Sequence, residues 1–169
     1  VRLLQKLLEE IDAGLDDDTL MLCKLHRLAG SGIDFSGFRH IRAFPPQWET
    51  YDVLCAADVL VSDYSSVIFD FLCTGRPIAL FCYDHEEYVQ KRGCYFDPAQ
   101  LDLPMAHTAK QLLDLLKKEM PAPDQRLCAR FVAEDDADSC ARICRALFLK
   151  EEGITGVSHT LPERKRTLV

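Results

Sequence analysis

The hydrophobic residues of this chain form short continuous runs that alternate with segments of helical spacing. A short apolar run is typical of a buried strand, and apolar residues three or four positions apart are typical of one helix face. Strands are predicted at 20–25, 39–44, 59–62 and 78–82, and helices at 1–15, 50–57, from 67 onward, 107–120, 125–133 and 139–150. Because strand and helix alternate through residue 82, the expected fold is α/β, a Rossmann-like parallel sheet with helices on both faces.

The stretch ADVLVSDYSSVIFDFLCTGRP, from Ala57 to Pro77, contains the clearest change from strand to helix. The period changes at Ser65 and Ser66, either of which is the expected N-cap, and Gly75 is the expected stop. A helix that begins beside the end of a parallel strand presents unpaired N–H groups and a partial positive charge, which suit phosphate oxygens. Serines at helix starts usually act as caps, so capping alone and phosphate binding both stay open.

Composition narrows the class of protein. The chain has 169 residues, 48% hydrophobic and 28% charged, with a net charge of −7. This balance is typical of a globular protein and argues against a nucleic-acid partner. No apolar stretch approaches the roughly 20 residues that span a bilayer, so we expect a cytoplasmic protein with one domain at 1–150 and a flexible tail at 151–169.

Two features of the sequence suggest a metal or disulfides at first sight. The eight cysteines are scattered without a C-x-x-C pair, and several lie in apolar runs, so we expect free thiols and no zinc site. The segment from Asp84 to Tyr88 contains His85, Glu86 and Glu87. We interpret it as a solvated helical turn and predict no bound metal.

The central stretch and the later FCYDHEEYVQKRGCYFD, at 81–97, together resemble the CDP-glycerol glycerophosphotransferase family, the teichoic-acid primases and polymerases. The resemblance covers 22–97 well and 131–147 loosely, where Ala137 replaces the family's usual glycine. The matching residues are Asp58, Asp63, Tyr64, Ser65, Ser66, Asp70, Arg76, Pro77, Tyr83, Asp84, Glu87, Tyr88, Arg92, Gly93 and Asp97.

The resemblance implies the second, CDP-binding half of a two-domain GT-B protein. The first domain, which would face the acceptor, and the opening strand of the second domain are then expected outside this chain. The implied donor is CDP-glycerol or a related CDP-polyol, with no cofactor and no metal. The implied acceptor is a teichoic-acid-like or capsular polymer or its lipid-linked primer, which would bring the protein to the inner face of the cell membrane through the missing domain.

The resemblance also implies a catalytic role for His26, which ends the strand in a Lys-Leu-His sequence. The family carries a histidine there, which would donate to the diphosphate and stabilise charge as CMP leaves. Arg27 replaces a proline that often follows. The alternative is a histidine with only a structural role at the strand end.

Six further residues are candidate nucleotide or diphosphate ligands. Ser65 and Ser66 would hold the diphosphate oxygens, and Arg76 and Arg92 are candidate charge partners for phosphate or ordinary surface arginines. Asp63 would repel phosphate, so it would orient His26 or the loop, accept a hydrogen bond from ribose or cytosine, or be merely structural. Asp70, one helical turn past Ser66, would reach a ribose hydroxyl or only favour the helix start.

Three functions stay open at this point. The first is transfer of glycerol phosphate, with this chain supplying the donor-nucleotide site and inactive without an acceptor domain. The second is a half-protein that binds a CDP nucleotide without catalysis. The third is transfer from CDP-ribitol or a nucleotide sugar.

Overall fold

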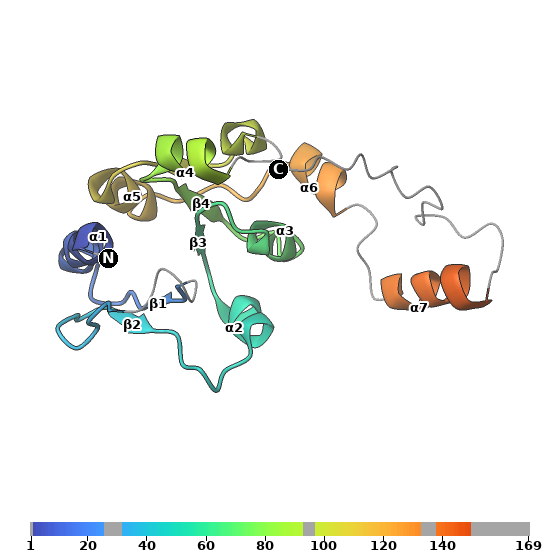
Figure 1. Ribbon diagram of the computed structural model, residues 1–169, viewed down its shortest axis with the longest axis horizontal. Helices are drawn as coiled ribbons and strands as arrows, with labels where there is room; N and C mark the ends of the chain where they lie inside the picture. The colour runs from blue at the N-terminus through green and yellow to red at the C-terminus, as the bar shows by residue number, and fades with distance from the viewer. Residues whose placement is uncertain (1, 26–31, 93–96, 133–137, 150–169) are drawn as a thin grey trace.

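The computed structural model describes residues 2–25, 32–92, 97–132 and 138–149, apart from the side chain of Arg92 (Figure 1). The strands of this part form two parallel sheets. In the smaller sheet β1 (Met21–Cys23) pairs with β2 (Ile41–Ala43). In the larger sheet β4 (Ile78–Phe81) lies between β3 (Leu60–Ser62) and β5 (Met105–Ala106).

Helices cover both faces of these strands. On one face α1 (Arg2–Gly14) and α5 (Ala109–Leu116) share a core with both sheets, which includes Leu8, Ile11, Ile41, Ala79, Ala106 and Leu112. On the other face α3 (Val67–Leu72) and α6 (Gln125–Phe131) pack in a second core, with Ile68, Phe71, Ile78, Leu80 and Leu127. The α/β class with parallel strands and helices on both faces is therefore confirmed, and the described strands form two sheets.

The remaining elements extend the predicted pattern. They are α2 (Thr50–Ala56), α4 (His85–Arg92), the 3-10 helix η1 (Pro98–Leu101), α7 (Ser139–Cys144) and the π-helix η2 (Arg145–Leu149). The sequence pattern missed β5 and η1. Figure 1 shows α7 apart from the body of the molecule, and three of the exposed large hydrophobic side chains, Leu147, Phe148 and Leu149, belong to η2.

The carboxylate of Asp12 joins α1 to the start of β2. It accepts hydrogen bonds from the backbone N–H groups of Arg39, His40 and Ile41, at 2.9, 2.7 and 2.9 Å. Burial raises the pKa of Asp12, but these three bonds outweigh it, so the net shift of the pKa is downward. Asp12 therefore stabilises the joint as an anion.

The free thiols predicted from the sequence are confirmed for the cysteines in the described residues. Cys94 and the predicted tail at 151–169 lie outside those residues. Among the described helices, none has the length and apolar character to cross a membrane.

All five strands run in the same direction within their sheets, so the segments that follow them lie at carboxyl ends. Lys24 follows β1, Asp63 follows β3, Cys82 follows β4 and His107 follows β5. In open α/β sheets ligands bind outside the carboxyl ends of the strands. This edge is where a functional site is expected.

Candidate functional site

The turn between β3 and α3 is organised by Asp63. Its Oδ1 accepts a hydrogen bond from the backbone N–H of Ser65 at 3.2 Å, the pattern of an Asx turn. Among the roles predicted for Asp63, the contact that the structure gives it is therefore the one that shapes the loop. The carboxylate of Asp63 thus binds the protein's own backbone. Ser65 and Ser66 follow it in the same turn.

The two serine hydroxyls contribute little to capping α3. Ser66 occupies the N-cap position, but its side chain makes no cap hydrogen bond. Ser65 Oγ lies 3.5 Å from the N–H of Val67, at the limit of a hydrogen bond. Both serines are exposed. The hydroxyls are thus available to a ligand, and capping alone does not explain two serines here.

Tyr64 points from the same turn toward α4. Its hydroxyl donates to Asp84 Oδ1 at 3.1 Å, and its ring stacks on Tyr88 with centroids 3.8 Å apart. Burial, with Cys82 and Asp84 adding to it, raises the pKa of the Tyr64 hydroxyl far above its ordinary value. The hydroxyl therefore stays protonated and acts as a donor, and it holds the serine turn against the segment that follows β4.

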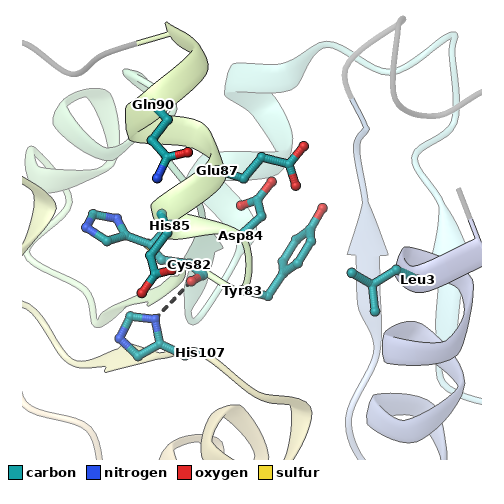
Figure 2. Close-up of a pocket in the computed structure, with 9 residues that line it drawn as sticks. Leu3, Cys82, Tyr83, Asp84, His85, Glu87, Gln90 and His107 are labelled. Atoms are coloured by element: carbon teal, nitrogen blue, oxygen red, sulfur yellow. Dashed lines mark hydrogen bonds between the residues drawn. The ribbon is translucent and has the colours of Figure 1, made fainter.

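A pocket of about 520 Å³ opens beside this junction at the carboxyl ends of β4 and β5. Figure 2 shows Tyr83 and Asp84 on one side, with Leu3 of α1 facing Tyr83 across the opening. Burial, then the charges of Asp84, Asp63 and Glu87, raise the pKa of Tyr83. The pocket is therefore walled by carboxylates and a neutral phenol, which suits hydroxyl groups or a nucleobase edge better than a bare phosphate.

Two histidines complete the pocket wall. His107 Nδ1 lies 2.9 Å from the carbonyl oxygen of Cys82 (Figure 2). A carbonyl only accepts, so Nδ1 carries a proton, and in the neutral imidazole the lone pair is then on Nε2. His85 Nδ1 is buried and has no hydrogen-bond partner within the described part of the chain.

The segment from Asp84 to Tyr88 is more than the solvated turn that the sequence suggested. It begins the eight-residue helix α4, and its Asp84, His85 and Tyr88 are half-buried, while Glu86 and Glu87 are exposed. The interpretation as a solvated turn is therefore wrong for the half-buried side chains. Among the described residues no group of three or more His, Cys, Asp or Glu side chains could hold a metal ion.

Arg76 follows the carboxyl end of α3, whereas the two serines precede its amino end. Its guanidinium donates to the carbonyl oxygen of Leu54 at 2.7 Å and to that of Ala57, at the end of α2, and lies over the ring of Phe71. These contacts are structural, and the role as a phosphate partner stays a prediction. Asp70 is exposed in the first turn of α3, where a carboxylate favours the helix start.

Two predicted site residues cannot be compared with the structure. His26 lies outside the described residues, and Arg92 closes α4 with a side chain that is not described. Lys24, two residues before His26, donates to Thr50 Oγ1 and lies over the ring of Phe44. The structure thus brings Asp63, Ser65 and Ser66 together in one turn. The distance from this turn to His26 lies outside what the described residues define.

The serine turn and the segment that contains α4 lie within the match to a known family model. The model for CDP-Glycerol:Poly(glycerophosphate) glycerophosphotransferase matches residues 4–149. The chain belongs to this family. The family model covers the serine turn, α4 and every residue of the pocket wall except Leu3.

Relatives within the glycerophosphotransferase family act on teichoic acids, by their names. A teichoic acid glycerol-phosphate transferase of Staphylococcus aureus is 30% identical over 83% of this chain and 38% of its own length. A teichoic acid poly(ribitol-phosphate) polymerase of Bacillus spizizenii is 31% identical over 62% of this chain and 17% of its own length. The chain therefore spans less than two fifths of these relatives.

A solved structure shares the fold. The wall teichoic acid polymerase TagF superposes with a TM-score of 0.66 at 26% identity, over 80% of this chain and 35% of the polymerase chain. A variant of the same polymerase, soaked with CDPG, superposes with a TM-score of 0.64 at 26% identity, over 80% and 36% of the two chains. The GT-B-like fold expected from the sequence is thereby confirmed.

Sequence reasoning missed the pocket and the bridge from Tyr64. Tyr64 was recognised only as part of the matching sequence, Asp84 and Tyr88 also as ends of a solvated turn, and His107 only as a helix start. The signal for Cys82 was its place at the end of the predicted strand 78–82, but the two residues before His107 were too few to indicate a strand. Without β5 in the predicted fold, His107 could not be placed at the same edge as Cys82.

Proposed function

We propose that this chain supplies the donor-nucleotide site of an enzyme that transfers glycerol phosphate from CDP-glycerol to a hydroxyl group of a teichoic-acid-like polymer or its lipid-linked primer. The observation that carries the proposal is the turn from Asp63 to Ser66 at the carboxyl end of β3. Its two serine hydroxyls are exposed and contribute little to capping α3. Membership in the glycerophosphotransferase family supports it.

The reaction that we propose is the one that the resemblance to the glycerophosphotransferase family implies. An acceptor hydroxyl attacks the β-phosphorus of CDP-glycerol, a phosphodiester bond forms, the bond to the bridging oxygen of the diphosphate breaks, and CMP leaves with that oxygen. Ser65, Ser66 and the backbone N–H groups of the turn would hold the diphosphate oxygens. His26 would stabilise the charge that develops on the leaving CMP. Positioning and charge neutralisation then supply most of the catalysis.

The cytidine would lie toward the pocket beside α4. We propose that Tyr83, Asp84 and His107 bind the ribose and the base of the cytidine. Carboxylate and imidazole acceptors suit the hydroxyl and amino donors of these groups. No metal ion takes part in the proposed mechanism. The acceptor and its general base would belong to a separate acceptor domain, and the proposal places the enzyme in the cytoplasm at the inner face of the membrane.

CDP-ribitol is a second candidate donor. The poly(ribitol-phosphate) polymerase of Bacillus spizizenii has nearly the same identity to this chain, 31%, as the glycerol-phosphate transferase of Staphylococcus aureus, 30%, over a smaller share of the chain. The glycerol and ribitol groups would both extend away from the diphosphate, so the turn at Ser65 and Ser66 does not discriminate between them.

Calorimetric titration of CDP-glycerol, CDP-ribitol, CDP and UDP into this chain tests the proposal. We expect both CDP-polyols and CDP to bind more tightly than UDP, and Ser65→Ala/Ser66→Ala to weaken binding at least about tenfold, or about 1.4 kcal/mol. Ser36→Ala, an exposed serine in the loop before β2, is the matched control and should bind like the parent. Equal affinity for UDP and CDP, or no effect of the double variant, would contradict a donor site at this turn.

Catalysis is tested on a longer protein that includes the acceptor domain. We expect transfer of glycerol phosphate to polymer that His26→Ala reduces while CDP-glycerol still binds. Binding without transfer in that longer protein would favour the non-catalytic alternative, a half-protein that only holds a CDP nucleotide.

A further inference from the structure

The described chain ends in one continuous helical segment, 139–149, which is formed by α7 and η2. Apolar residues occur in it at the spacing i, i+3, i+4, i+7 and i+8, which is typical of one helix face. We call this face the apolar stripe. Its members are Cys140, Ile143, Cys144, Leu147 and Phe148. A face of this kind normally packs against the body of a protein or against a partner.

Every member of the apolar stripe is exposed. The exposed fraction is 47% at Ile143, 59% at Leu147 and 78% at Phe148, and Leu149 beside them is 66% exposed. The helices α1 and α5, by contrast, bury apolar residues of their own faces in the core. Figure 1 shows α7 apart from that core. A continuous exposed apolar surface indicates an interaction site, whereas single exposed apolar residues do not.

The positions outside the apolar stripe give the segment its inner side and its charge. Ala146 is the buried residue of the segment, so the stripe faces outward. Arg145 is exposed, and Arg142 donates from Nη2 to Ser139 Oγ at 3.1 Å. The segment contains no Asp or Glu, whereas the whole chain has a net charge of −7. The apolar stripe therefore lies in a locally basic segment of an acidic protein.

The charge of the segment distinguishes between two occupants of the stripe. A second copy of this chain would bring two further arginines beside Arg142 and Arg145 without a carboxylate of the segment to pair with them, so the charges would repel. An anionic surface would pair with both guanidinium groups, and phosphate oxygens suit guanidinium donors in particular. A basic helix with one apolar face is typical of a segment that lies on a membrane surface.

The length of the segment determines how it meets a bilayer. α7 has six residues and η2 has five, together about half of the roughly 20 that cross the hydrocarbon core. An amphipathic helix on a membrane lies in the plane of the interface, with its apolar side toward the acyl chains and its charges toward the headgroups. The apolar stripe and the two arginines match this arrangement.

We propose that the apolar stripe of α7 and η2 binds the surface of an anionic lipid bilayer. The segment lies parallel to the membrane plane, with Leu147 and Phe148 at the boundary between headgroups and acyl chains. Arg142 and Arg145 reach the lipid phosphates, while their aliphatic stems cover part of the apolar surface. The proposal gives this chain a membrane contact of its own, and it does not rest on the proposed transferase function.

Co-sedimentation of the whole chain with lipid vesicles, in the absence of nucleotide, tests the proposal. One set of vesicles is phosphatidylcholine, and the other is an equal mixture of phosphatidylcholine and phosphatidylglycerol. We expect binding to the mixed vesicles to be at least about tenfold tighter, because each arginine near an anionic surface adds attraction. High salt should weaken this binding, because it screens the charges.

One pair of variants tests the apolar side chains. Leu147→Glu/Phe148→Glu should weaken binding to the mixed vesicles at least about tenfold, because the apolar surface is lost. Leu20→Glu/Tyr51→Glu makes the same change of charge at two exposed apolar side chains outside the segment, and it should lose far less binding. Circular dichroism of each variant reports whether the fold is retained.

A second pair of variants tests the charges. Arg142→Gln/Arg145→Gln should remove most of the preference for phosphatidylglycerol. Lys117→Gln/Lys118→Gln makes the same change of charge at two exposed lysines at the end of α5, and it should keep the preference.

Fluorescence reports whether the stripe itself enters the bilayer. Trp48 is the single tryptophan of the chain and lies in the loop before α2. The double variant Trp48→Phe/Phe148→Trp moves this probe to the stripe. We expect its emission to shift to the blue and to be quenched by brominated lipid when mixed vesicles are added, while the emission of Trp48 in the parent stays unchanged.

Several results would overturn the proposal. They are equal affinity for the two kinds of vesicle, no binding to the mixed vesicles, binding that survives Leu147→Glu/Phe148→Glu, and an unshifted emission of the relocated probe. A concentration-dependent dimer that Leu147→Glu/Phe148→Glu abolishes in the absence of lipid would also overturn it, since the stripe would then belong to a second copy of the chain.

Discussion

The hydroxyl of Tyr64 donates a hydrogen bond to Asp84 Oδ1 over 3.1 Å, and this bond ties the turn after β3 to the segment after β4. Tyr64 precedes Ser65 directly, and Asp84 precedes α4. The position of the serine hydroxyls therefore depends on the same contact that shapes the pocket wall.

Tyr64→Phe isolates the contribution of this bond. The ring and its stacking on Tyr88 are kept, while Asp84 loses a donor. We expect the free energy of unfolding to fall by about 1 kcal/mol, and CDP-glycerol to bind several-fold more weakly because the turn is less fixed. Chemical denaturation and calorimetry check the two effects. Tyr83→Phe, which removes a neighbouring hydroxyl but not this bond, is the control for stability, and equal stability losses in the two variants would contradict the account.

Arg76→Met distinguishes a structural role from phosphate binding. The substitution leaves the carbonyl oxygens of Leu54 and Ala57 without the guanidinium donor. We expect a loss of about 2 kcal/mol in the free energy of unfolding, since two hydrogen bonds from a charged donor to part-buried carbonyl groups are lost. Nucleotide affinity, measured well below the unfolding temperature, should stay close to that of the parent.

Arg39→Met provides the comparison for that experiment. Arg39 pairs with Asp17 on the surface at 2.8 Å, with both side chains more than two thirds exposed. Such a pair contributes roughly 0 to 1 kcal/mol. A large loss of nucleotide affinity in Arg76→Met without a loss of stability would instead support the role predicted from the sequence, a phosphate partner.

Because of Asp12, the free energy of unfolding changes with pH in the acid range. Its pKa is below the ordinary value of 3.8 in the folded chain, so folding is favoured by the ionised form. The contribution is complete at pH values above 3.8 and is lost as the pH falls through the lower pKa of the folded state. Asp12→Asn, which cannot ionise, should lower stability at pH 7 by about 1.5 kcal/mol.

The measurement for Asp12 is the difference in unfolding free energy between parent and variant as a function of pH. We expect the difference to shrink as the pH is lowered below 4, since the parent then loses the charge that the variant lacks. The other carboxylates with lowered pKa, Asp34, Glu87 and Asp114, titrate alike in both proteins and cancel. A difference that does not change with pH would show that the shape of the Asp12 side chain matters and its charge does not.

Elements with strong local signals were predictable from the sequence. The apolar face of α1, the run of β4, and Thr108 as the cap of α5, which accepts from Gln111 N–H at 3.2 Å, all follow from spacing or capping chemistry. Gly75 stops α3 as expected, with a φ of +67° and its N–H bonded to Leu72. These features depend on residues close together in the chain.

Features that depend on distant residues were not predictable in this way. β5 has two residues after a proline, too few for a hydrophobic period, and it is defined only by its pairing with β4. The bond from Tyr64 to Asp84 joins residues twenty positions apart. The contacts of Arg76 with the carbonyl groups of Leu54 and Ala57 were likewise not predictable, because they join segments about twenty positions apart.

The most direct test of the donor site is an amide NMR titration of this chain with CDP-glycerol, followed residue by residue. The account predicts the largest shift changes at the amides of Ser65, Ser66 and Val67, with smaller changes at Tyr83 and His107 along the same edge. Leu112 of α5, buried in the core beneath the opposite face, is the internal reference and should not move. Saturable changes confined to other surfaces, with the serine turn unaffected, would contradict the assignment of this turn as the diphosphate site.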